Sequence, residues 1–125
     1  MSLPGTVRVL VVDDQVEMAQ MVADHLCDLG YEGMATSSGT EALQLLATER
    51  IDALVTDLRM PGLDGLSLLQ ASQALDPSRP VVLMTAFSAF DSALEAAGLG
   101  AYHYLTKPFR LDKLVSILEK ALRKG

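Results

Sequence analysis

Cysteine is almost absent from this chain of 125 residues, in which Cys27 is the single example. A lone thiol excludes an intramolecular disulfide and a metal cluster built from cysteines. It also favours a reducing compartment, so we expect a cytoplasmic protein. The neighbours of Cys27 predict a packed thiol on a helix in preference to a reactive one.

Long apolar runs are absent as well. No stretch approaches the roughly 18 apolar residues that a membrane-spanning helix needs, and no signal-peptide pattern opens the chain. We therefore expect no association with a membrane. Half of the residues are hydrophobic and 21% are charged, which is typical of a globular protein. The length predicts a single domain over residues 1–125.

Basic residues are scarce in the first half of the chain. Residues 1–57 contain ten acidic residues against Arg8 and Arg50, and the net charge of the whole chain is −6. Such a balance does not favour binding to the phosphate backbone of nucleic acids. The basic residues near the C-terminus fit the solvated face of a helix. We expect no direct nucleic-acid binding by this chain.

Continuous apolar runs alternate with amphipathic segments along the chain. The runs predict buried parallel strands, and the segments between them have apolar residues at helical spacing. The expected strands are 7–12, 33–37, 53–56, 81–84 and 101–105. The expected helices are 18–29, 38–47, 66–74, 88–97 and 111–122, with Gly30 ending the first and Ser38 capping the second. This alternation indicates an α/β fold whose parallel sheet is covered on both faces.

Polar side chains stand where four of these strands end. Asp13 and Asp14 follow the first strand, and Asp57 follows the third. Thr85 follows the fourth strand, and Lys107 follows the fifth. In open α/β sheets, ligands bind outside the carboxyl ends of the strands. We therefore expect these five side chains to share one pocket.

The chemistry of this set narrows its role. Three neighbouring carboxylates repel one another, and a divalent cation relieves the repulsion; oxygen donors alone favour Mg²⁺ over zinc. Lys107 adds a positive charge, and Thr85 adds a hydroxyl that can donate to an anion. Together they predict a receptor for a phosphoryl group, with Asp57 as the nucleophile that forms an acyl phosphate. The simpler interpretation is a set of helix caps with one surface lysine.

Four segments carry a resemblance to a known family. They are VVDD at 11–14, TDLRMPGLDG at 56–65, MTA at 84–86 and YLTKPF at 104–109. In these segments the chain resembles the receiver domain of two-component response regulators, the CheY-like superfamily, from about Arg8 to Arg123. The resemblance implies a flavodoxin-like three-layer fold with a five-stranded parallel sheet of order 2-1-3-4-5 and five helices.

The resemblance also implies roles for single residues. Asp57 would accept the phosphate, and Thr85 and Lys107 would contact the phosphoryl oxygens. Mg²⁺ would be held by Asp57, by Asp14, by the backbone carbonyl of Arg59 and, through water, by Asp13. The residues around the lysine would include a cis Lys107–Pro108 peptide and a switch aromatic, Tyr104. Such a domain promotes its own phosphorylation and dephosphorylation and is not a conventional turnover enzyme.

The resemblance further implies partners. A sensor histidine kinase or a phosphotransfer protein would supply the phosphate. The segments around Asp57 and from Thr85 to Phe109 look most like receivers of sigma-54-dependent AAA+ activators. This likeness implies transcription regulation through an output domain and a phosphorylation-dependent homodimer, with the fourth helix, fifth strand and fifth helix as the switching face. A free-standing regulator that acts by protein contact is the alternative.

Two other classes share this architecture. A haloacid-dehalogenase-like phosphatase also uses a strand-end aspartate, but it normally has a second acid two residues later, where Arg59 stands. A flavin- or nucleotide-binding module needs a phosphate-cradling glycine loop after the first strand, where Asp13, Asp14 and Gln15 stand instead.

Overall fold

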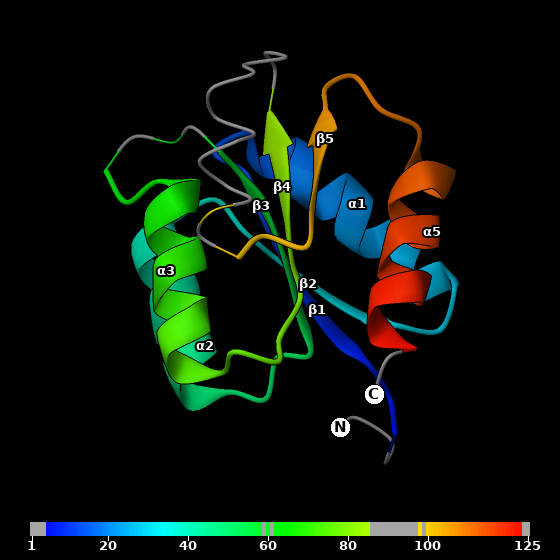
Figure 1. The fold of residues 1–125 in the computed structure, drawn as a ribbon. Coiled ribbons are helices and arrows are strands. Elements are labelled where there is room, and N and C mark those ends of the chain that lie inside the picture. Colours follow the sequence, from blue (N-terminus) through cyan, green and yellow to red (C-terminus); the bar gives the residue numbers. More distant parts are fainter. Residues whose placement is uncertain (1–4, 59, 61, 86–97, 99, 124–125) are drawn as a thin grey trace.

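The computed structural model describes residues 5–58, 60, 62–85, 98 and 100–123. Within these residues, five parallel strands form one sheet of order β2-β1-β3-β4-β5 (Figure 1). The strands are β1 (Arg8–Val12), β2 (Glu32–Thr36), β3 (Ala53–Asp57), β4 (Val81–Thr85) and β5 (His103–Thr106). The order confirms the expected doubly wound topology, in which β1 and β3 are neighbours at the centre.

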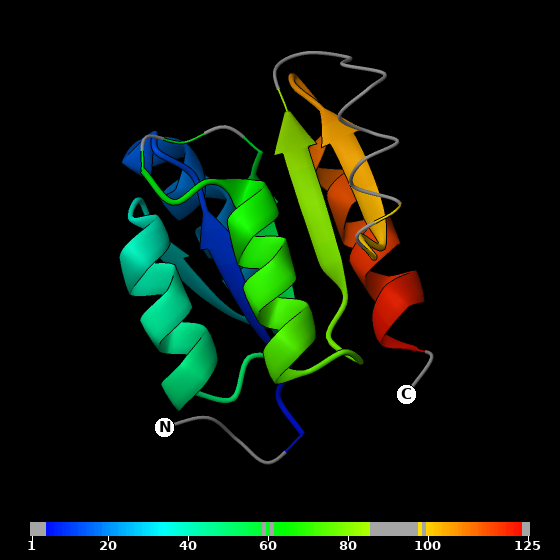
Figure 2. The same ribbon diagram turned by 60° about the vertical axis from the view of Figure 1, so that its left-hand side comes forward.

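Helices cover both faces of this sheet. The described helices are α1 (Val16–Asp28), α2 (Gly39–Thr48), α3 (Gly65–Leu75) and α5 (Leu111–Leu122). Helices α1 and α5 lie on one face, and α2 and α3 lie on the other (Figures 1 and 2). The expected helix 88–97 lies outside the described residues. None of the described helices has the length and apolar character that a bilayer crossing requires.

The alternation of strand side chains divides the core into two halves. Val9, Val11 and Val55 face α1 and α5, whereas Leu10, Val12 and Leu54 face α2 and α3. All six are fully buried, because both sheet faces are covered. The continuous apolar runs of the sequence therefore reflect burial on both sides.

Two helix ends follow the sequence signals closely. Gly30 adopts φ +98° after α1, and its N–H donates to the Cys27 carbonyl while the Tyr31 N–H donates to the Leu26 carbonyl. This pair of bonds is a Schellman motif. Ser38 caps α2, since its Oγ accepts the Glu41 N–H at 3.1 Å. Both sequence predictions are confirmed.

Most element bounds differ by one or two residues from those expected, and the placement of one side chain was wrong. Strand β5 begins at His103 instead of residue 101. Cys27 lies on α1 as expected, but its side chain is exposed and not packed in the core. Its Sγ accepts the Gly33 N–H at 3.3 Å, so the thiol contacts the edge strand β2. The period of α1 places Leu26, and not Cys27, toward the sheet.

Arg79 is a buried cation at the end of the sheet opposite Asp57. Its side chain is 7% exposed, its Nε donates to the Ile51 carbonyl at 2.8 Å and its Nη1 donates to Ser72 Oγ at 3.0 Å. Burial lowers the pKa of Arg79, and the charges of Asp76 and Asp52 act against that effect. The guanidinium thereby ties the end of α3 to the entries of β3 and β4.

We expect Arg79→Met to lower the free energy of unfolding by about 2–3 kcal/mol, because it leaves the Ile51 carbonyl and the Ser72 hydroxyl without their charged donor. Ser72→Ala, which removes one of these bonds, should cost less than half as much. Urea unfolding of the three proteins measures both effects. An Arg79→Met variant as stable as the wild type would contradict the structural role of this arginine.

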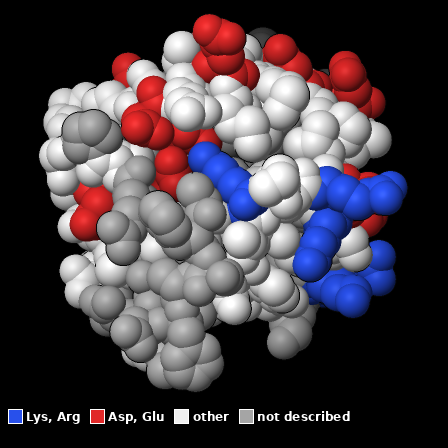
Figure 3. Space-filling view, turned by 90° about the horizontal axis from the view of Figure 1, so that it is seen from above, with Lys and Arg blue, Asp and Glu red and all other residues white. Residues whose placement is uncertain are grey.

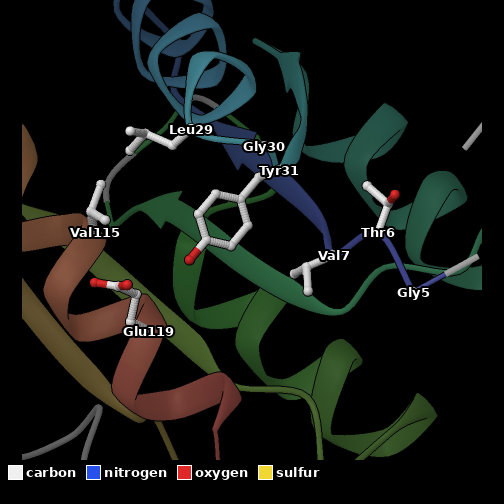
Figure 4. A pocket seen from close by; sticks show the side chains of 8 residues that line it. All are labelled: Gly5, Thr6, Val7, Leu29, Gly30, Tyr31, Val115 and Glu119. Atoms are coloured by element: carbon white, nitrogen blue, oxygen red, sulfur yellow. The ribbon is translucent and has the colours of Figure 1, made fainter. Parts of the chain in front are cut away.

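A pocket of about 440 Å³ also lies at this end of the sheet (Figure 4). Tyr31 lines it together with Val7, Val115 and Glu119, and its ring points toward the two α5 residues. Burial raises the pKa of Tyr31 above the ordinary 10.0, and the carboxylate of Glu119 raises it further, while Arg123 lowers it. Folding therefore favours the neutral phenol.

The raised pKa of Tyr31 predicts a loss of stability in alkali. Well below its ordinary pKa of 10.0 the phenol is neutral in both states; as the pH rises through that value toward the raised folded pKa, the unfolded chain releases the proton more readily than the folded one, so folding weakens. We expect urea midpoints to fall more steeply for the wild type than for Tyr31→Phe between about pH 9 and about pH 11. If the urea midpoints of the two proteins fell in parallel with pH, Tyr31 would not contribute to the loss of stability in alkali.

Candidate phosphoacceptor site

Three carboxylates meet at the carboxyl edge of the sheet. Asp13 and Asp14 directly follow β1, and Asp57 is the last residue of the neighbouring strand β3. Oxygen atoms of the three side chains all lie within 4.8 Å of one another. Asp13 is fully buried and Asp57 is 8% exposed, whereas Asp14 is exposed. The cluster therefore has a buried floor and one acid open to solvent.

Lys107 joins this cluster from the carboxyl end of the edge strand β5. Its Nζ donates to Asp13 Oδ2 at 2.6 Å and to Asp57 Oδ2 at 3.4 Å. Its backbone N–H donates to the Thr85 carbonyl at 2.6 Å, just past the pairing of β4 with β5. The Lys107–Pro108 peptide is cis, as the sequence resemblance implied. The lysine is thus held by both its backbone and its ammonium group.

Backbone contacts fix the acids in place. Asp13 Oδ1 accepts the Gln15 N–H at 2.9 Å, and the Asp13 N–H donates to the Thr36 carbonyl at 3.2 Å. After Asp57, the Leu58 N–H donates to the Met84 carbonyl at 2.7 Å. The acids are therefore placed by the strand ends themselves and are not carried on a free loop.

The charges of the cluster shift two pKa values. Burial raises the pKa of Asp57; the nearby charge of Lys107 lowers it, and the carboxylates of Asp13 and Asp14 raise it again. For Lys107, desolvation acts to lower the pKa, but the hydrogen bonds and charges of Asp13 and Asp57 prevail, and the pKa is raised. Negative charge is thus in excess, and the site favours an added cation.

The donor set suits magnesium. Carboxylate oxygens are the ligands that this small, hard cation prefers, and among the described residues no cysteine or histidine belongs to this cluster. Figure 3 looks onto this edge of the sheet and shows acidic side chains gathered on one part of it and basic side chains on another. With its three carboxylates close together, the cluster is therefore a candidate site for a hard divalent cation.

The structure brings together most of the residues that the sequence singled out. Asp13, Asp14, Asp57 and Lys107 form one cluster. Thr85 is 5% exposed at the end of β4. Tyr104 lies on β5, where it is 42% exposed and its ring centroid is 6.3 Å from that of His103. Arg59, the expected source of a metal-binding carbonyl, lies outside the described residues.

Sequence reasoning missed the turn between β2 and α2. The Thr36 carbonyl accepts the Asp13 N–H, and Gly39, the first residue of α2, lies close against the backbone of Leu63. The capping signal at Ser38 located the turn correctly. This local signal carried no information about the segments that pack against the turn, which are those of Asp13 and Leu63.

The fold and the acidic cluster together define the CheY-like class of flavodoxin-like domains. Comparison with known proteins agrees: the response regulator receiver domain matches residues 9–119. The chain belongs to this family. Membership favours the receiver interpretation over the phosphatase and flavin-binding alternatives.

Relatives of known sequence are transcriptional regulators. The chain is 40% identical over 114 residues to the DNA-binding transcriptional regulator NtrC of Escherichia coli (strain K12), which covers 91% of this chain and 24% of that protein. It is 36% identical over 116 residues to the regulatory protein AtoC of the same organism, with 93% and 25% covered. The chain therefore spans about a quarter of the length of the curated relatives that it matches.

Solved structures show the same fold. A receiver domain protein from Clostridium thermocellum superposes with a TM-score of 0.88 at 30% identity, covering 94% of this chain and 95% of that one. NtrX from Brucella abortus, crystallised with ADP, has a TM-score of 0.88 at 32% identity, covering 95% of this chain and 27% of that one. The chain thus resembles both isolated receivers and a receiver within a longer regulator.

Proposed function

We propose that Asp57 accepts a phosphoryl group from a histidine kinase or a phosphotransfer protein, and that this modification switches an output. The observation that carries the proposal is the convergence of Asp57 with Asp13, Asp14 and Lys107 at one edge of the sheet. Receiver domains of response regulators interact with histidine kinases, and family membership supports the same kind of partner here.

The transfer itself is a displacement at phosphorus. An Oδ atom of Asp57 attacks the phosphorus, and the bond from phosphorus to the donor nitrogen breaks. The donor imidazole keeps the electron pair of that bond, and Asp57 becomes an acyl phosphate. Lys107, already 3.4 Å from Asp57 Oδ2, is placed to neutralise charge on the phosphoryl oxygens. The hydroxyl of Thr85 would donate to another of these oxygens.

We assign the acidic cluster to Mg²⁺, which would supply charge neutralisation for the carboxylates and the phosphoryl oxygens. Asp14 and Asp57, with the backbone carbonyl of Arg59, would hold the ion directly. Asp13 is assigned an indirect role through water, because Gln15 and Lys107 already donate to its two oxygens. The charge excess of the cluster supports this assignment.

The switch is assigned to Thr85 and Tyr104. Phosphorylation would draw the Thr85 hydroxyl toward the phosphoryl group, and the exposed ring of Tyr104 would then turn inward and change the surface around β5 and α5. Phosphate shifts such an equilibrium only by its differential stabilisation of the two states, on the order of a few kcal/mol. The exposure of Tyr104 in this structure supports an outward starting position.

For the output, we propose control of an attached domain in transcription regulation, with a homodimer that forms on phosphorylation. The named functions of the relatives support this proposal. A free-standing regulator is the alternative, and a receiver that superposes as an isolated chain supports it. Size measurement with and without beryllofluoride separates the two: a dimer supports the activator type, and an unchanged monomer supports the free-standing type.

Incubation with acetyl phosphate tests the central proposal. With Mg²⁺ present, intact mass should show one added phosphoryl group, which hydroxylamine should remove because acyl phosphates react with it. With EDTA in place of Mg²⁺, little or no phosphoryl group should be added. A wild-type protein that stays unmodified with Mg²⁺ would refute the function.

A further inference from the structure

The pocket near Tyr31, here called the amino-end pocket, is built from three separate parts of the chain. Its walls come from the entry of β1, from the connection between α1 and β2, and from α5; they include Val7, Leu29, Tyr31, Val115 and Glu119. Its volume of about 440 Å³ falls within the range of about 300–1,000 Å³ that is usual for small-molecule sites. The cavity is therefore large enough for a small ligand, and it lies at the opposite end of the sheet from the acidic cluster.

Apolar side chains form much of the wall of the amino-end pocket. Val7, Tyr31 and Val115 are half-buried and pack against the core cluster between the sheet and the helices α1 and α5. Leu29 is a large apolar side chain that is nevertheless 51% exposed. A ligand that removed this surface from water would gain from the hydrophobic effect. The occupant of the pocket therefore needs an apolar body.

The charges around this pocket favour a cation. Glu119 lines it, and within the part of the chain that the structure describes its carboxylate forms no ion pair within 4.0 Å. Leu29 and Gly30, which follow the last turn of α1, bring the partial negative charge of that helix end to the pocket. The face of an aromatic ring such as that of Tyr31 also attracts cations. Carboxylate, helix end and ring therefore act in the same direction.

The phenol of Tyr31 shows that these charges act on the pocket. Burial raises its pKa, and the carboxylate of Glu119, toward which the hydroxyl is directed in Figure 4, raises it further. Arg123 lowers this pKa, but it does not line the pocket. Among the described residues that line the pocket, none is basic. A bound cation would therefore meet a carboxylate without a counter-charge and a neutral hydroxyl oxygen.

We propose that the amino-end pocket binds a small organic cation, namely a protonated primary amine with an apolar body. The ammonium group would lie between the Glu119 carboxylate and the Tyr31 hydroxyl, and the apolar body would cover Leu29 and Val115. The occupant is a free small molecule, because the volume matches that class and a single carboxylate offers one point of contact instead of an extended charged surface. This binding is separate from the proposed phosphorylation, which concerns the other end of the sheet.

Titration with 2-phenylethylammonium, followed through amide chemical shifts in two-dimensional NMR, tests the proposal. Mg²⁺ is present throughout, so that it competes with the amine for the acidic cluster. We expect saturable shifts at Gly30, Tyr31 and Glu119. The alcohol 2-phenylethanol has the same apolar body without the charge, and it should bind about fivefold more weakly because it loses the attraction of the carboxylate and the ring.

Two glutamate variants locate the charge that the amine recognises. Glu119→Gln should weaken binding of the amine by about threefold and leave binding of the alcohol unchanged, since only the ion pair is lost. Glu17→Gln is the matched control, because it makes the same substitution in the first turn of α1, at the other end of that helix from the pocket. It should leave the affinity for the amine unchanged. Both glutamates are exposed, so both variants should fold as the wild type does.

Several results would overturn the inference. The amine could cause no saturable shift at the pocket residues, the alcohol could bind as tightly as the amine, or the two glutamate variants could lose affinity equally. Tighter binding of the anion 3-phenylpropionate than of the amine would also overturn it, because the pocket would then favour the opposite charge. None of these results would affect the proposed phosphorylation, which is measured separately by intact mass after incubation with acetyl phosphate.

Discussion

Asp57→Asn should take up no phosphoryl group from acetyl phosphate under conditions in which the wild type takes up one. The amide oxygen of asparagine is a poor nucleophile and carries no charge, so no acyl phosphate forms. Asp13 is fully buried and bonded to Lys107, and it is not placed to replace Asp57 as the acceptor. Intact mass after incubation with Mg²⁺ measures the difference directly.

The same variant should remain folded. Burial and two neighbouring carboxylates raise the pKa of Asp57, which means that its ionised form is disfavoured in the folded state. Asparagine removes this cost and also loses the contact with Lys107, which at 3.4 Å is the longer of the two lysine bonds. We expect urea midpoints equal to or above that of the wild type. A loss of phosphorylation can then not be ascribed to unfolding.

Asp64→Asn is the matched control for this change. It makes the same substitution seven residues later, where the side chain caps α3, and asparagine caps helices about as well as aspartate. The Asp64 variant should keep both phosphorylation and stability. Phosphoryl uptake by the Asp57 variant at the wild-type level would place the acceptor elsewhere and contradict the assignment.

The sheet and the identity of the clustered residues could be predicted from the sequence because both depend on local patterns. Apolar runs such as 7–12 and 81–84 end in polar residues, and the parallel topology brings those ends to one edge. Asp13, Asp57 and Lys107 were found in this way, although 94 positions separate the first from the last. To locate a ligand site at the carboxyl edge of a parallel sheet, only the strand ends and the order of the strands are needed.

Features that depend on long-range packing could not be predicted. Arg79 is buried because a carbonyl before β3 and a hydroxyl on α3 meet it, and neither partner is visible from its sequence neighbours. The contact of Gly39 with Leu63 joins two segments whose approach depends on how α2 and α3 pack. Cys27 was expected to be packed because of its apolar neighbours, but it lies one position after the buried Leu26 on α1 and is exposed.

Lys107→Met should produce the largest loss of stability among the site variants. The ammonium group is the counter-charge of Asp13, which is fully buried, and it also meets Asp57. Removing one partner of a buried pair leaves an uncompensated carboxylate and typically costs about 3–5 kcal/mol. We expect this loss in urea unfolding without Mg²⁺, together with a fall of about 100-fold in the phosphorylation rate, since a preorganised donor to the phosphoryl oxygens is lost.

A double-variant cycle with Asp13→Asn separates the ion pair from other effects of the lysine. If the cost arises from the stranded charge of Asp13, the double variant Asp13→Asn/Lys107→Met should be more stable than Lys107→Met alone. Added Mg²⁺ should also stabilise Lys107→Met more than the wild type, because the cation supplies the charge that the lysine provided. Equal Mg²⁺ effects in the two proteins would mean that lysine and metal act on separate charges, and that the three carboxylates do not form one electrostatic unit.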